Sequence, residues 1–209
     1  MYVPELAKDI LEQISFEARE SEFIDSKSGV SARLSITAFE NLLSTAERRA
    51  LVNGDEKTAV RLSDFMGIVP AITGKVELVY EGEQEGAHHV AKQLIADAVK
   101  TEFLNYFPKI EKLQKEGDPD PYEDLVGWFF EQSGGFELLD TTTDDEFQLQ
   151  LDRVEPLDEL LDKFVDTSAE DRNFYKEVIL WALVEFKKLS KYNLSDGLRF
   201  KDVYGGYSW

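Results

Sequence analysis

The chain has no cysteine among its 209 residues. Disulfides, thiolate metal sites and cysteine nucleophiles are therefore excluded. Histidine is nearly absent as well, because only His88 and His89 are present. On a helix, adjacent side chains point about 100° apart, so these two cannot easily bind one metal ion. We expect two surface histidines and no metal site.

Long hydrophobic runs are also missing. The most apolar stretch is VILWALVEF at 178–186, far shorter than the roughly 20 residues that span a bilayer. The N-terminal stretch MYVPELAKDILEQISFEARE carries charges throughout and lacks the apolar core of a signal peptide. The sequence therefore predicts a soluble, cytoplasmic protein with no membrane partner.

Positive charge is scarce relative to negative charge. The chain has 23 basic and 42 acidic residues, and its net charge is −19. Such a surface repels the phosphate backbone of nucleic acids, so we expect no nucleic-acid partner. A hydrophobic content of 43% and an aromatic content of 12% nevertheless indicate a folded protein with a sizeable core.

Apolar residues recur at helical spacing along most of the chain, which predicts a mainly α fold. Residues 76–80 are ambiguous, since Val76, Leu78 and Tyr80 alternate as in a strand. The Gly- and Pro-containing stretch KEGDPDPYED at 115–124 is the best internal boundary. The main expected helices cover residues 3–21, 32–52, 63–74, 87–106, 124–132 and 168–192, and another follows DTTTDDEF.

The chain has no complete catalytic motif. Gly74-Lys75 suggests a phosphate loop, but Val69 and Val76 stand where that motif needs Gly and Ser or Thr. The acidic clusters, such as 144–146, lack the central Gly and distal Glu of a calcium loop. We expect these acids to be solvated loop residues, and we identify no catalytic residue.

Arg33 is unusual because it lies in the first turn of an expected helix that Ser31 would cap. That end of a helix is electropositive and favours an acid. The conventional explanation is an ion pair, with Asp25 or Glu40 as the partner. The alternative is an anion such as a phosphate, held by the guanidinium and the free amides together. By contrast, Arg48-Arg49 are expected on the polar face of the helix.

Residues 6–86 resemble the lid region of AAA+ ATPases in the magnesium-chelatase and MoxR-like group. The stretches that carry the resemblance are ISFEARESEFIDSKSGVSARLSITAFENLLSTAERRAL and RLSDFMGIVPAITGKVELVYEGEQEG. In that family a Gly–small–Ser–x–Arg element opens a lid helix, which SGVSARL matches with Gly29, Ser31 and Arg33. The resemblance implies that Arg33 is the sensor-2 residue, which contacts the γ-phosphate of ATP.

The resemblance also implies a domain organisation and a set of partners. Residues 1–86 would form the helical lid bundle and residues 87–209 a C-terminal helical extension. The family's Walker A, Walker B, sensor-1 and arginine-finger elements are absent, so the chain looks like the C-terminal part of an ATPase. ATP and Mg²⁺ would bind the complete protein and not this chain alone. The expected partners are the AAA+ core domain, neighbouring subunits of a ring and a protein client. The alternative is a stand-alone helical interaction module without ATPase activity.

Overall fold

The computed structural model describes residues 1–27, 30–110, 120–132 and 134–203. The chain forms two compact units, Met1–Leu51 with Glu56–Glu102 and Val52–Asp55 with Phe103–Trp209. One division between the units falls between Glu102 and Phe103, inside a helix. The boundary of an AAA+ lid at residue 86 stays a prediction. Most of the expected boundary stretch 115–124 lies outside the described residues.

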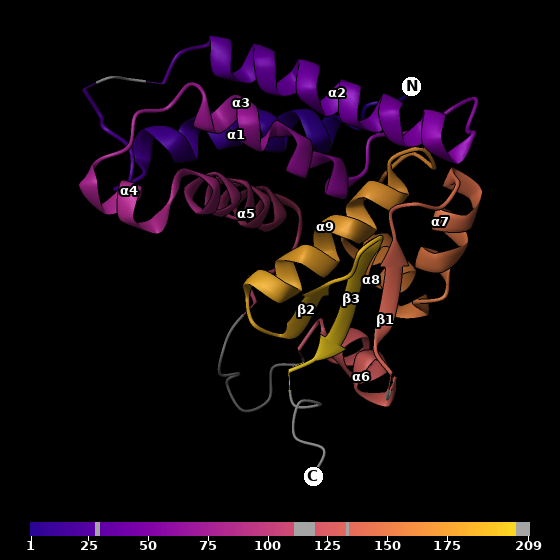
Figure 1. The fold of residues 1–209 in the computed structure, drawn as a ribbon. Helices are drawn as coiled ribbons and strands as arrows, with labels where there is room; N and C mark the ends of the chain where they lie inside the picture. Colours follow the sequence, from indigo (N-terminus) through magenta and orange to yellow (C-terminus); the bar gives the residue numbers. More distant parts are fainter. Residues whose placement is uncertain (28–29, 111–119, 133, 204–209) are drawn as a thin grey trace. The chain divides into compact units, whose positions relative to one another are not determined.

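The first unit is built mainly from helices (Figure 1). Hydrogen bonds between side chains tie helix α1 to its neighbours: Ser15 and Ser35 join α1 to α2 at 2.8 Å. Thr101 donates to Glu17 at 2.8 Å and joins α5 to α1. The elements are α1 (Glu5–Glu20), α2 (Arg33–Asn53), the 3₁₀ helix η1 (Leu62–Ile68), α3 (Val69–Thr73), α4 (Tyr80–Glu85) and α5 (Ala87–Tyr106), and the last turns of α2 and α5 belong to the second unit.

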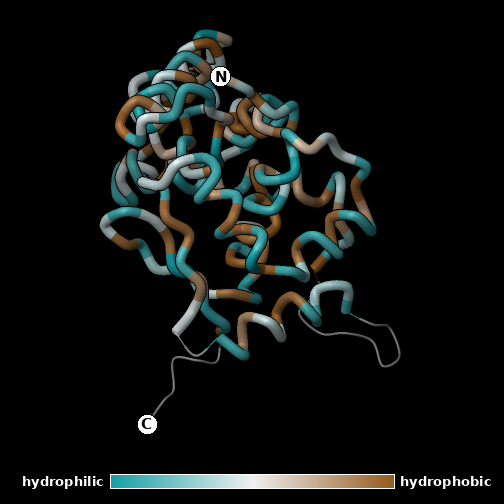
Figure 2. The backbone as a smooth tube through the Cα atoms, turned by 90° about the vertical axis from the view of Figure 1, so that its right-hand side faces the viewer, coloured by the Kyte–Doolittle hydropathy of each residue, from teal (hydrophilic) through white to brown (hydrophobic). Residues whose placement is uncertain are grey.

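The expected helices at 3–21, 32–52 and 87–106 are confirmed as α1, α2 and α5. The ambiguous segment at 76–80 forms no strand element, although Leu78 makes one isolated antiparallel bridge with Ile24. Figure 2 shows teal and brown stretches alternating along the coils, as expected for helices with one buried face.

The buried face of α2 agrees only in part with the apolar spacing of its sequence. That spacing selects Ile36, Phe39, Leu43, Ala46 and Ala50. Ala46 and Ala50 are buried, but Ile36 is 61% exposed. The helix is turned so that Leu34 and Leu42 are buried as well. The buried set, spaced four apart, is Leu34, Ala38, Leu42, Ala46 and Ala50.

The second unit combines helices with a small sheet (Figure 1). Its strands are antiparallel in the order β1-β3-β2, and α9 contacts β2, α8 and α7. Every residue from Phe174 to Leu183 in α9 is buried, as expected for a helix that is packed on more than one side. The elements are α6 (Glu123–Glu131), β1 (Phe136–Leu139), α7 (Asp144–Asp152), α8 (Glu155–Phe164), α9 (Arg172–Glu185), β2 (Leu189–Asn193) and β3 (Gly197–Asp202).

The prediction of a helix from 168 to 192 is wrong beyond Glu185. Helix α9 ends there, and Lys187 takes a left-handed conformation with φ 62°, which turns the chain away from the helix axis. The chain then forms the β2–β3 hairpin. Phe200 pairs with Phe136 across the β3–β1 ladder and is fully buried. The fold is therefore mainly helical with a three-stranded sheet, and this sheet was not predicted.

Candidate functional site

Arg33 is the first residue of α2, and its side chain is exposed. Its backbone N–H donates to the Ser31 hydroxyl at 3.2 Å, so Ser31 binds the helix start as expected for a capping residue. The first turn contains no acidic residue. The positive charge of the guanidinium therefore adds to the positive end of the helix dipole.

Neither of the ion pairs expected for Arg33 forms. Within the described part of the chain its guanidinium has no salt bridge, and Asp25 instead accepts a hydrogen bond from the backbone N–H of Lys27 at 2.8 Å. Glu40 lies in the second turn of the same helix and is also exposed. The conventional explanation of Arg33 by a carboxylate partner therefore finds no support in these contacts.

The backbone beneath Arg33 is firmly placed. Leu34, the next residue, is 1% exposed, and the Ser35 hydroxyl binds Ser15 of α1. The first turn of α2 is thus anchored in the first unit while Arg33 faces outward. Gly29, the first residue of the sequence element that includes Arg33, lies outside the described residues. This arrangement suits the binding of an anion by a guanidinium whose backbone is already ordered.

Arg49 has a different environment from its neighbour Arg48. Arg48 is exposed, as expected, but the Arg49 side chain is 8% exposed, so its expected place on the polar face is wrong. Its Nε and Nη2 atoms donate to the two carboxylate oxygens of Asp64 at 3.1 and 3.0 Å. The guanidinium also donates to the Thr58 hydroxyl at 3.0 Å and to the Ala59 carbonyl at 2.6 Å. Arg49 therefore holds η1 and the preceding loop against α2.

The other residues considered for chemistry form no site. His88 and His89 are exposed, and no cluster of potential metal ligands occurs among the described residues. Glu146 of the acidic segment 144–146 completes a capping box with Thr143 at the start of α7. Gly74 caps the end of α3 through a backbone hydrogen bond. Glu146 and Gly74 thus have structural roles at helix ends.

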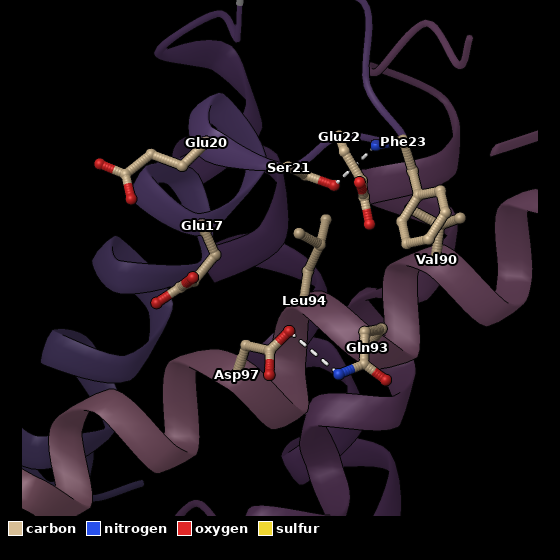
Figure 3. Close-up of a pocket in the computed structure, with 9 residues that line it drawn as sticks. All are labelled: Glu17, Glu20, Ser21, Glu22, Phe23, Val90, Gln93, Leu94 and Asp97. Carbon is tan, nitrogen blue, oxygen red and sulfur yellow. Dashed lines mark hydrogen bonds between the residues drawn. The ribbon is translucent and has the colours of Figure 1, made fainter. Parts of the chain in front are cut away.

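A hollow of about 420 Å³ lies in the first unit, at the end of α1 and along α5 (Figure 3). Its apolar part consists of Phe23, Val90 and Leu94, and the last two are almost fully buried. The polar part is strongly acidic. The remaining lining residues are Glu17, Glu20, Ser21, Glu22, Gln93 and Asp97.

A buried lysine lies at the centre of an ionic network in the second unit. Lys176 is 2% exposed, and its ammonium group donates to Asp152 at 2.7 Å and to Asp158 at 2.8 Å. Arg172 donates to Asp158 and to Asp162, each at 2.7 Å. The network joins α9 to α7 and α8, and each charge has an opposite charge beside it, so we assign it a structural role.

We expect acid to weaken this network through Asp158. Burial alone would raise the pKa of the Asp158 carboxyl, but hydrogen bonds from Arg172 and Lys176 lower it below 3.8. A lowered pKa in the folded state stabilises the protein above pH 3.8, and that stabilisation is lost as the pH falls through the folded-state pKa. Urea unfolding of wild type and Asp158→Asn should therefore give midpoints that differ at neutral pH and converge in acid. A difference that does not change with pH would contradict this expectation.

Comparisons of the chain with protein-family models, with curated proteins and with solved structures find no match. Among the helices of the described segments, none is both long and apolar enough to cross a membrane.

Arg33 was predicted from the sequence, but the hollow was not. The ionic networks around Arg49 and Lys176 were not predicted either. Arg48 and Arg49 are adjacent and of the same residue type, so the sequence does not tell which one is buried. Only the contact of Arg49 with Asp64 distinguishes them. Lys176 could have been noticed in the sequence, since it lies two residues before the apolar run that starts at Val178. No sequence pattern indicates the hollow, because the residues that line it come from two distant segments, 17–23 and 90–97.

Proposed function

We propose that the chain is the lid and C-terminal helical region of a magnesium-chelatase-like AAA+ ATPase. In this proposal Arg33 acts as the sensor-2 arginine for ATP that is bound by a separate core domain. The observation that carries the proposal is the placement of Arg33, which is exposed at the ordered start of α2 and has no carboxylate partner among the described residues. The mainly helical first unit is compatible with a lid bundle.

Arg33 has the chemistry that this role requires. A guanidinium donates charge-assisted hydrogen bonds to phosphate oxygens and stays protonated at any physiological pH. The positive end of α2 would add to the attraction for the γ-phosphate. The anchored Leu34 and Ser35 would limit the loss of backbone entropy when the arginine binds.

The remaining chemistry would belong to the core domain. Magnesium ATP, when bound, supplies the phosphoryl group that is transferred to water. The chain has no Walker A sequence to surround the phosphates, and the described residues contain no group of metal ligands. Arg33 would therefore respond to the γ-phosphate and stabilise its charge, while catalysis requires the core.

Residues 1–209 alone should bind ATP very weakly. Isothermal titration with magnesium ATP should show no binding tighter than about millimolar, which is about −4 kcal/mol, because one arginine cannot replace a phosphate-binding loop. A chain in which a Walker-type core is joined to residues 1–209 should bind and hydrolyse ATP. Micromolar binding by residues 1–209 alone would contradict the proposal.

The alternative function is a stand-alone helical interaction module, which the acidic hollow favours. The DNA immediately upstream of the coding sequence distinguishes the two functions. An in-frame segment that encodes Walker A and Walker B motifs would support the ATPase. If no such segment precedes the gene, the interaction module becomes the better explanation.

A further inference from the structure

We propose that the hollow in the first unit is a docking groove for a basic segment of a partner protein. An arginine or lysine side chain of this segment would lie in the hollow. Its aliphatic part would lie against Phe23, over the buried Val90 and Leu94, and its charged end would lie among the carboxylates at the rim. Arg33 is not among the residues that line the groove, so the inference goes beyond the proposed function and requires no nucleotide.

The negative charge of the groove is largely uncompensated. Asp97 has a cation partner, since Lys100 donates to it at 2.9 Å. Glu17 accepts hydrogen bonds from neutral groups, the Gln13 amide at 2.9 Å and the Thr101 hydroxyl at 2.8 Å. These bonds orient its carboxylate without neutralising it.

Two further carboxylates extend the negative charge toward solvent. Glu20 and Glu22 are exposed and make no salt bridge within the described part of the chain. In Figure 3, Glu22 and Phe23 extend toward α5, whereas the carboxylate of Glu20 points outward at the rim. A cation that enters the groove therefore meets several carboxylates and no competing basic lining residue.

The apolar part of the groove favours a cation with an aliphatic part over a small, fully hydrated one. Val90 and Leu94 are 1% and 4% exposed, so they pack beneath the floor, and the half-buried ring of Phe23 supplies apolar surface that an occupant can reach. Long basic side chains bury their aliphatic part on such a surface while the charged end stays near water. The guanidinium of an arginine can also lie against an aromatic ring.

The size and the charge of the groove agree with a protein segment as the occupant. The volume of about 420 Å³ is within the usual range for binding pockets, roughly 300 to 1,000 Å³, which is large enough for one or two side chains. The lining carboxylates would repel a nucleic-acid backbone. A peptide that contains both basic and apolar residues satisfies both parts of the lining.

A titration followed by NMR tests the proposal on the full chain. The probe is the peptide Ac-Ala-Arg-Leu-Arg-Ala-NH₂, added to isotope-labelled protein. We expect saturable shifts in the amide signals of 17–23 and 90–97, and weaker binding as salt is added. The same peptide with citrulline in place of arginine should give shifts that are much smaller, because citrulline keeps the shape and loses the charge.

Matched variants distinguish binding in the groove from an effect of the chain's overall negative charge. The double variant Glu20→Gln with Glu22→Gln should weaken peptide binding by about three- to tenfold. Glu12→Gln with Glu56→Gln removes the same charge at exposed positions outside the groove and should leave the affinity unchanged. Phe23→Ala should also weaken binding, with circular dichroism as the check on folding.

Three results would overturn the proposal. The first is the absence of saturable shifts at 17–23 and 90–97. The second is an equal loss of affinity in both double variants, which would mean that the peptide responds only to net charge. The third is equally strong binding of spermidine at the same signals, which would indicate a simple cation site in place of a protein-docking groove.

Discussion

If the chain is the lid of an ATPase, as proposed above, replacement of Arg33 by alanine in the protein that contains core and lid should lower ATP turnover by about 100-fold. That is the loss typical of removing one donor to a developing negative charge. Arg33 is exposed at the start of α2 and has no carboxylate partner in the described segments. Its loss should therefore affect the bound phosphate and not the fold. The measurement is steady-state ATP hydrolysis by the protein that contains both core and lid.

Two variants make the Arg33 result specific. Arg48→Ala removes an exposed arginine from the same helix and should leave hydrolysis unchanged. Arg33→Lys keeps the charge but loses the planar fork of donors, so an intermediate rate is expected. Thermal unfolding of Arg33→Ala should stay close to wild type, since exposed substitutions usually change stability by about 0.5 kcal/mol or less. Normal hydrolysis in Arg33→Ala would overturn the sensor assignment.

Replacement of Arg49 by alanine should lower the free energy of unfolding of the first unit by about 3–5 kcal/mol. Asp64 is 3% exposed and receives two hydrogen bonds from Arg49 and one from the backbone N–H of Arg61 at 2.8 Å. Without the guanidinium, its carboxylate would remain buried without its main opposite charge. The Ala59 carbonyl and the Thr58 hydroxyl would also lose a donor.

Urea unfolding of the full chain measures this loss, and Arg48→Ala is again the matched control, with little change expected. Arg49→Lys should be intermediate, because one ammonium group cannot make the two-point contact with Asp64. Two adjacent arginines would then differ strongly in their effect on stability. If Arg49→Ala unfolded at the same urea concentration as Arg48→Ala, the buried network would contribute far less than its geometry indicates.

Much of the helical structure can be predicted from the sequence, because its signals are local. Apolar residues at helical spacing predict α1, and Ser31 marks the start of α2. The hairpin after α9 was missed since its strands are short, and Phe200 is buried by pairing with distant Phe136. Contacts of that kind depend on register across the sheet, which local spacing does not encode.

Of the two candidate sites, one could be predicted from local sequence and the other could not. Arg33 could be found from the sequence because an arginine in the first turn of a helix is anomalous within its own few residues. The groove could not be found, since α1 supplies Glu17 and α5 supplies Leu94 from a distant part of the chain. Lining residues that lie far apart in sequence become neighbours only when the helices pack.

The sequence by itself determined the mainly helical character, the acidic surface and the absence of cysteine chemistry, because composition and periodicity act locally or as sums over the chain. Only the tertiary structure decided which of Arg48 and Arg49 is buried. It also decided which face of α2 is buried, with Leu34 inside and Ile36 in solvent. The physical reason is that burial depends on which neighbour fills the space beside a side chain, and those neighbours come from other helices.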